Sequence, residues 1–328
     1  MMPPVSARRA EALILAPEPA VTIRPAGDAD VEPMLDLVEN QAFVHPLTRA
    51  DLRRLFTIQW DDRAPLRGFV LEDDGGHLLG CLGVISSPPR HVAGRRLVTA
   101  NLHTMFVDSR RRYHQAGGSA RRYSLDLLAA STSLGVPVTA LTARGPGEVV
   151  PRLLSQLSFE AVSDGDVFSS RHAAMLGAWR QPGTVVSSRE AVDRWLDEEQ
   201  QRIVADHRAL GSGCHVLHDG GRSCLIITRR RQYPVEWLWP FASWRRIGRR
   251  RVPVTDILHL SDADLAGRSW DRLVSHVSRA EASLGVSCAT AIRPTSARPT
   301  IPRKMFVHGR QTPPGSIDKL YSELALLP

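Results

Sequence analysis

The segment Asn101-Leu-His-Thr-Met-Phe-Val107 is followed by a basic turn, by Gln115-Ala-Gly-Gly-Ser-Ala120, and by a helical pattern that closes at Gly135. The helix is indicated by apolar residues that recur on one face, namely Tyr123, Leu127, Leu128 and Leu134. A strand that enters a glycine-containing turn and then a helix brings backbone N–H groups and the positive end of a helix dipole together. The stretch therefore predicts a strand, a phosphate-binding loop and a helix.

The loop carries a family resemblance. Gln115-Ala-Gly-Gly-Ser-Ala120 resembles the Gln/Arg-x-x-Gly-x-Gly/Ala motif of GNAT-type N-acyltransferases, whose loop holds the pyrophosphate of an acyl-coenzyme A. Between Val107 and Gln115 lie about three residues more than the family usually has, and they fall in Arg110–Arg112. A register that starts at Arg112 would restore the usual length but would put Gln115 where glycine belongs. The Gln115 register explains the helix and is preferred.

The resemblance implies a binding site for acetyl-CoA or another acyl-CoA. A backbone N–H near Met105 to Val107, where the strand parts from its neighbour, would donate to the thioester oxygen as negative charge develops there. The residues expected to bind the coenzyme are Met105, Phe106, Val107, Arg112, Gln115, Ala116, Gly117, Gly118, Ser119 and Ala120.

The strand before the loop supplies the candidate catalytic residues, His103 and Asn101. Strand alternation places Asn101, His103 and Met105 on one face. Many relatives have a carboxylate base near Asn101, a role that asparagine cannot serve. His103, with an intrinsic pKa of about 6.5, is the candidate general base, directly or through water. The alternative is a structural histidine on a buried strand. Leu154 stands where relatives have a tyrosine that protonates the departing thiolate.

Composition sets limits on the class of protein. The chain has 328 residues, 43% of them hydrophobic, and a net charge of +8 that comes almost entirely from arginine. Such a charge favours anionic ligands, although coding bias can also produce it. The four cysteines show no Cys-x-x-Cys spacing, so no metal site is expected. Free cysteines indicate a reducing compartment, and the expected location is the cytoplasm. No apolar run is long enough to span a membrane.

The expected fold class is α/β, with two GNAT-like domains in tandem, each a mixed, mostly antiparallel sheet flanked by helices. Residues 1–20 are expected to be a tail, 21–182 the acyl-CoA-binding domain and 183–328 a second, degenerate domain. The second domain repeats the order helix, hairpin, strand, helix, strand, with the acidic Ser261–Asp264 where the loop would be. Within it, Arg293–Pro314 is rich in proline and arginine and is expected to be irregular.

These patterns predict an N-acyltransferase, most simply an N-acetyltransferase, that acts on an amine of a small molecule or a protein. The alternative is a non-catalytic module that binds an anionic partner through Arg229–Arg251, where runs of arginine flank Trp237, Trp239, Phe241 and Trp244. Those tryptophans could equally pack between the two halves, and nucleic acid is not the expected partner. A free-nucleotide site is discounted because the turn lacks the Gly-Lys-Ser/Thr of a P-loop.

Overall fold

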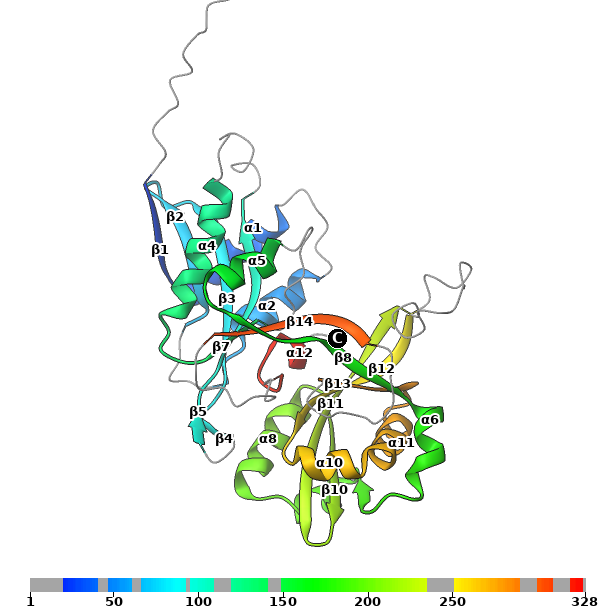
Figure 1. Ribbon diagram of the computed structural model, residues 1–328. Coiled ribbons are helices and arrows are strands. Elements are labelled where there is room, and N and C mark those ends of the chain that lie inside the picture. The colour runs from blue at the N-terminus through cyan, green and yellow to red at the C-terminus, as the bar shows by residue number, and fades with distance from the viewer. Residues whose placement is uncertain are drawn as a thin grey trace, which may run out of the picture.

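The computed structural model describes residues 20–40, 47–60, 66–92, 95–108, 119–140, 149–234, 251–289, 300–308 and 319–326. Twelve of the described strands form one continuous sheet in the order β1-β2-β3-β6-β7-β14-β8-β13-β12-β11-β10-β9. Figure 1 shows two lobes joined by two long strands, β8 (Glu160–Ser170) and β14 (Thr300–His308). The predicted α/β class, with mixed sheets flanked by helices, is confirmed.

The first half of the sheet begins with four antiparallel strands: β1 (Val21–Ala26), β2 (Gly68–Asp73), β3 (Leu78–Ser86) and β6 (Ala100–Val107). The next strand, β7 (Val138–Ala140), is parallel to β6, and the helix α4 (Ser119–Thr132) connects them. A parallel pair needs such a crossover because the chain must return to the same end of the sheet. The other elements are η1 (Asp28–Asp30), α1 (Val31–Glu39), α2 (Arg49–Thr57), α5 (Val149–Gln156) and the separate ribbon β4 (Arg90–Val92) and β5 (Arg95–Leu97).

Helices cover both faces of this half because its strands bury side chains on both sides. In β2, Phe69 and Leu71 pack into the cluster that contains the apolar side chains of α4 and α5. Val70, between them, packs into the opposite cluster with α1 and α2. Successive side chains of a strand point to opposite faces, so a strand buried on both faces is apolar throughout.

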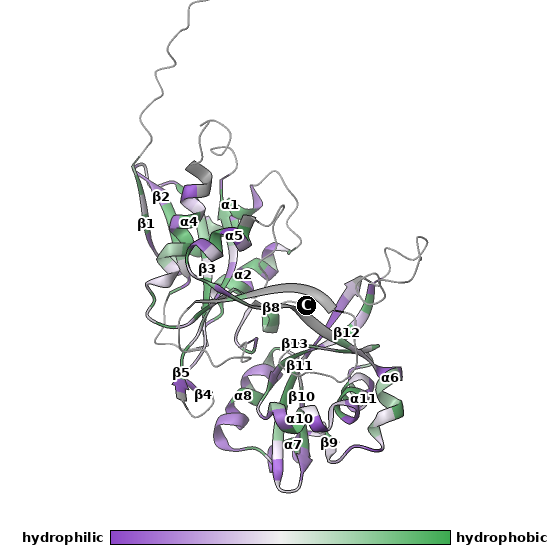
Figure 2. Ribbon diagram, viewed as in Figure 1, coloured by the Kyte–Doolittle hydropathy of each residue, from purple (hydrophilic) through white to green (hydrophobic). Residues whose placement is uncertain are grey.

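The second half repeats this arrangement, and the repeated element order predicted from the sequence is confirmed. The strands are β9 (Thr184–Val186), β10 (Gly213–Asp219), β11 (Arg222–Pro234), β12 (Arg251–Leu260) and β13 (Gly285–Ala289). β12 and β13 are parallel, and α10 (Ala263–Arg268) and α11 (Trp270–Ala280) connect them. The helices α7 (Arg189–Arg194) and α8 (Glu198–Ala209) cover one face, and α6 (Arg171–Ala178), α10 and α11 the other. Figure 2 shows hydrophobic positions running along β10 and β11 between these layers.

β14 is the main departure from the predicted order. The irregular segment expected at Arg293–Pro314 is wrong for its central part, which is a strand inserted between β7 and β8. Phe306 to His308 pair with β7, while Thr300 to Val307 pair with β8. The last residues of β8, from Asp166 onward, pair with β13. The division at 182/183 stays a prediction, but β14 carries residues after 183 into the first half of the sheet.

Local contacts set the boundaries of three further elements. β6 starts at Ala100, and residues 95–97 before it form β5 and pair with β4. α7 and α8 are separate helices, and Asp197 caps α8 by accepting from the backbone N–H of Gln200. Before α1, Asp30 accepts a hydrogen bond from the N–H of Gly27.

The C-terminal segment 319–326, which includes α12 (Glu323–Leu326), packs on the fold. Leu320, Tyr321 and Leu324 are buried in the cluster that also contains α7 and α8. The Tyr321 ring lies edge-on to Trp60, with centroids 5.0 Å apart, and its hydroxyl donates to Asp206 at 3.1 Å. Trp60 belongs to the first half and Asp206 to the second, so this segment ties the two halves together.

Candidate functional site

The parallel strands β6 and β7 run together for a short distance only. Their pairing covers Ala100 to Leu102 on β6 and Val138 to Ala140 on β7. β6 continues to Val107, still paired with β3 on its other side. From His103 to Val107 the described strand pairing of β6 is with β3, and we call the other side of this segment, beyond the described end of β7 at Ala140, the open edge of β6. The chain passes from this open edge towards the start of α4 at Ser119.

A β-bulge interrupts β6 at this point. His103 pairs with Gly83 and Met105 with Leu82, which leaves Thr104 as an extra residue with a φ of 41°. An extra residue reverses the alternation of side chains beyond it. Met105 accordingly packs against the α4 face, while His103 contacts Phe56 of α2. The expectation that Met105 shares a face with His103 is wrong for this reason.

The hydrogen bond of Asp108 shows which backbone N–H groups near the end of β6 point towards the open edge. The N–H of Asp108 donates to the carbonyl of Leu79 at 2.8 Å, on the β3 side. Because donors alternate along a strand, the N–H of Phe106 points to the same side and that of Met105 to the β7 side. The Met105 amide thus has the direction that the sequence prediction requires of a donor to a thioester oxygen.

His103 is buried, with 4% of its surface exposed. Its Nδ1 lies 3.2 Å from the Thr104 hydroxyl, and its Nε2 has no hydrogen-bond partner among the described residues. Burial lowers the pKa of His103 to about 3, because the charged imidazolium loses its hydration. The ring is therefore neutral at physiological pH and weakly basic, yet it can still accept a hydrogen bond.

Asn101 is fully buried, and both ends of its amide are engaged. Its Nδ2 donates to the backbone carbonyl of Tyr321 at 2.9 Å, and its Oδ1 accepts a hydrogen bond from the Thr139 hydroxyl. These bonds connect β6 to β7 and to the C-terminal segment. The side chain of Asn101 therefore holds three segments in place.

Only part of the predicted coenzyme site lies in the described residues. Arg112 and the loop residues Gln115, Ala116, Gly117 and Gly118 fall outside them, and Ser119 and Ala120 are the first two residues of α4. Phe106 and Val107 are buried in the sheet. Leu154, at the position of the family's tyrosine, is fully buried in the α4–α5 cluster.

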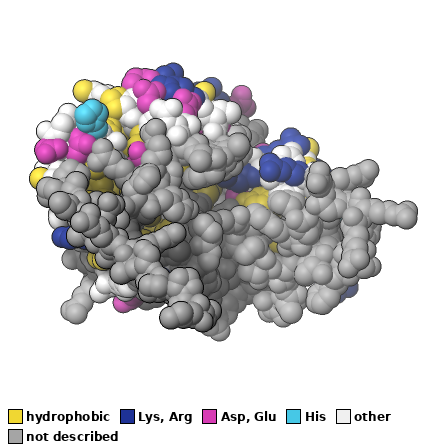
Figure 3. All heavy atoms as spheres, turned by 90° about the horizontal axis from the view of Figure 1, so that it is seen from above, with side chains coloured by type: hydrophobic (Ala, Val, Ile, Leu, Met, Phe, Trp, Pro, Cys, Tyr) yellow, Lys and Arg dark blue, Asp and Glu magenta, His cyan; other side chains and the backbone are white. Residues whose placement is uncertain are grey.

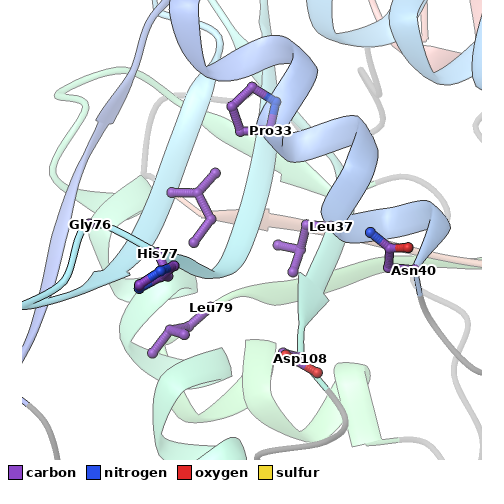
Figure 4. A pocket seen from close by; sticks show the side chains of 8 residues that line it. Pro33, Leu37, Asn40, Gly76, His77, Leu79 and Asp108 are labelled. Carbon is purple, nitrogen blue, oxygen red and sulfur yellow. The ribbon is translucent and has the colours of Figure 1, made fainter.

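A cavity of about 530 Å³ lies beside the end of β6. Figure 4 shows the side chains that line it, from α1, from the β2–β3 turn and from the end of β6. They are Pro33, Leu37, Asn40, Gly76, His77, Leu78, Leu79 and Asp108. The sequence analysis missed this cavity; the one available signal was the acidic Asp108 directly after an apolar strand.

Charged side chains on the neighbouring surface are largely paired with one another. Arg49 contacts Glu32, Asp36 and Glu39, so acidic groups of α1 surround one guanidinium of α2. Figure 3 shows acidic and basic side chains side by side on the described part of this face. The described residues contain no cluster of His, Cys, Asp and Glu that could hold a metal, and no described helix is long and apolar enough to cross a membrane.

The arginine-rich stretch 229–251 is described only at its ends, since 235–250 lie outside the described residues. Arg229 donates to the carbonyl of Leu210. Arg231 donates to the carbonyl of Leu324, and its Nε lies 3.1 Å from Oδ2 of the buried Asp256. Two arginines of the stretch are thus used inside the fold, which does not favour the non-catalytic alternative.

No protein-family model matches the chain, and no curated protein matches it. It is similar to solved structures of a GCN5-related N-acetyltransferase from Anabaena variabilis (10% identity, TM-score 0.48, 88% of this chain and 72% of that chain covered) and another from Kribbella flavida (10%, 0.48, 88% and 71%). Eis1 from Mycobacterium abscessus is a third (14%, 0.45, 88% and 73%).

Proposed function

We propose that the chain transfers an acyl group, most simply acetyl, from acyl-CoA to an amine. The observation that carries this proposal is the open edge of β6, which ends where the chain turns towards the phosphate-binding motif and α4. An acyl thioester laid along that edge would meet the N–H of Met105. A donor aimed at a developing oxyanion is often the largest single contribution to such catalysis.

The loop Gln115–Ala120 would hold the diphosphate of the coenzyme. Its last two residues, Ser119 and Ala120, begin α4, and the N-terminus of a helix favours negative charge. This role rests on the sequence motif, and the neighbouring Arg112 would add a cation.

The acceptor amine would enter from the α1 side of the sheet. The cavity there is lined by Asp108 and Asn40, whose oxygens can accept hydrogen bonds from an ammonium group. His103, on the same α1–α2 side, would accept a hydrogen bond at Nε2 from the amine or from a water. With a pKa of about 3, it would orient the nucleophile more than store its proton. Asn101 is a positioning residue in this scheme.

No dedicated acid is required for the departing thiolate. A free thiol has a pKa of about 8.5, so a thiolate is a good leaving group near neutral pH and solvent can protonate it afterwards. The replacement of the family's tyrosine by the buried Leu154 is therefore compatible with turnover.

Calorimetric titration of the full chain with acetyl-CoA tests the coenzyme site. Saturable binding is expected, and Gly118→Asp should abolish it by placing a carboxylate against the diphosphate. Gly27→Asp is the matched control, because a Cβ added at Gly27 meets nothing within 4 Å. Absence of binding, or equal binding by both variants, would rule out the proposal.

Thiol release from acetyl-CoA with a panel of amines tests the reaction itself. Turnover with at least one amine is expected. Binding of acetyl-CoA without turnover of any amine, together with salt-sensitive binding of polyanions, would instead support the non-catalytic alternative.

A further inference from the structure

Polar side chains of the second half converge on Ser187, the residue that follows β9. Ser187 Oγ lies 2.7 Å from Nδ1 of His215 on β10 and 2.7 Å from Nε2 of His276 on α11. The other ring nitrogen of His215, Nε2, lies 3.2 Å from Oε1 of Glu281, which follows the end of α11. A hydroxyl, an imidazole and a carboxylate are therefore connected in series.

The position of each proton follows from what each group can donate. The hydrogen bond from His215 is the main cause that lowers the pKa of Glu281, so the carboxylate is ionised and only accepts. His215 consequently carries its proton on Nε2 and accepts from the Ser187 hydroxyl at Nδ1. Burial lowers the pKa of His276 to about 4, which leaves it neutral near pH 7 and able to donate from Nε2 to the serine oxygen.

The surroundings hold this arrangement at the surface of the second half. His215 is 2% exposed, whereas Ser187 is exposed. Thr228 donates to Oε1 of Glu281 at 3.3 Å, and a Cβ at Gly213 would overlap both that carboxylate and the Thr228 hydroxyl. The glycine on β10 thus leaves the space that the carboxylate occupies. The nearby cations are Arg230, which faces Glu281, and Arg279, which faces His276.

We propose that Ser187 is the nucleophile of a second acyl-transfer site that takes carboxylic esters, with His215 as its base and Glu281 as a positioning residue. The serine Oγ forms a bond to the acyl carbon while its proton moves to His215 Nδ1. The carbon–oxygen bond of the ester breaks, and the departing alkoxide takes that proton. Water then attacks the acyl carbon, passes a proton through the same nitrogen back to Oγ, and releases the acid.

A fluorophosphonate probe tests the nucleophile directly in the full chain. Ser187 Oγ is expected to form a bond to phosphorus as the phosphorus–fluorine bond breaks, giving one adduct that peptide mass spectrometry places on Ser187. Ser187→Ala should remove the adduct. Ser188→Ala is the matched control, because Ser188 is also exposed and its side chain makes no capping hydrogen bond. An unlabelled wild-type chain, or an adduct that survives in Ser187→Ala, would overturn the proposal.

The labelling rate tests the base and the carboxylate. A general base contributes roughly 100-fold or more, so His215→Gln and Glu281→Gln should slow labelling by about that factor. Circular dichroism checks that the variant of the buried His215 folds, and Glu281, which is partly exposed, provides the second variant. Labelling of folded Glu281→Gln at the wild-type rate would show that the contacts merely satisfy a buried histidine. Gly118→Asp should label normally, which separates this site from the proposed acyl-CoA site.

Discussion

The side-chain amide of Asn101 donates a hydrogen bond of 2.9 Å to the backbone carbonyl of Tyr321, a residue 220 positions further along the chain. Asn101 lies opposite Thr139 on the parallel pair β6–β7, and in the second half Asp256 lies opposite Ser287 on the parallel pair β12–β13. The two halves thus carry a polar side chain at the same place in the repeat. The first half has an amide there, and the second has a carboxylate that faces Arg231.

This comparison predicts the effect of Asn101→Asp. The carboxylate would lose the donor to Tyr321 and would be buried, and neither described partner of Asn101 is a cation. We expect a loss of about 1–3 kcal/mol or more in the free energy of unfolding at pH 7. The loss should shrink towards pH 4, because burial raises the pKa of the new carboxyl and its neutral form tolerates the site. Denaturant unfolding at both pH values measures it, with the exposed Asn40→Asp as control; equal effects at the two positions would contradict the prediction.

The buried His103 should make the free energy of unfolding depend on pH. Its pKa is about 3 in the folded chain and about 6.5 when unfolded, so the unfolded state binds the extra proton between these values. The full contribution of the neutral His103 to the free energy of unfolding is present above about pH 6.5. It declines as the pH falls, by at most about 1.4 kcal/mol per pH unit. The slope of unfolding free energy against pH between 6.5 and 4 should therefore be smaller in His103→Gln than in wild type. Parallel slopes would show that the imidazole is protonated in the folded state.

The parts of the fold that follow local rules were the ones that could be predicted. The helix face at Tyr123 and Leu127, the hairpin turn at Gly220 and the repeated element order all depend on spacing within a few residues. β14 could not be predicted this way, because Pro302 interrupts its pattern and its partners β7 and β8 lie far away in the sequence. No local signal marks Pro302 as part of a strand.

In the candidate site, too, the locally determined elements could be predicted and the features that depend on distant contacts could not. The strand and the helix could be predicted from the sequence, and the loop motif between them stays a prediction. The bulge at Thr104 depends on the register between β3 and β6 and therefore on a tertiary contact. It changed the face of Met105. The burial that makes His103 a weak base also comes from elements such as α2, which the strand's own sequence does not reveal.

We predict that a glycine is needed at position 83 because the His103 ring occupies the space of a Cβ there. The two residues are opposite one another on β3 and β6, and a Cβ at Gly83 would overlap the imidazole ring. Gly83→Ala should cost about 1–3 kcal/mol of stability, as overpacking of a buried site does. In the Gly83→Ala/His103→Ala double variant the overlap is gone, so the two effects should not add. Thermal unfolding of the wild type, the two single variants and the double variant measures this coupling. Additive changes in stability would mean that the ring does not occupy this space. Gly27→Ala, which meets open space, should be close to neutral.

Arg231 and Asp256 form an ion pair inside the second half. The carboxylate is fully buried and also accepts a hydrogen bond of 2.6 Å from the Tyr233 hydroxyl. Removing one partner of a buried pair leaves an uncompensated charge, so Arg231→Met should cost about 3–5 kcal/mol. Arg231→Met/Asp256→Asn should recover part of that loss, because no charge remains. The exposed pair of Arg53 with Glu32 is the control, and Arg53→Met should leave the free energy of unfolding nearly unchanged. Urea unfolding measures all three, and a double variant no more stable than Arg231→Met would show that Arg231 acts through Leu324 rather than through Asp256.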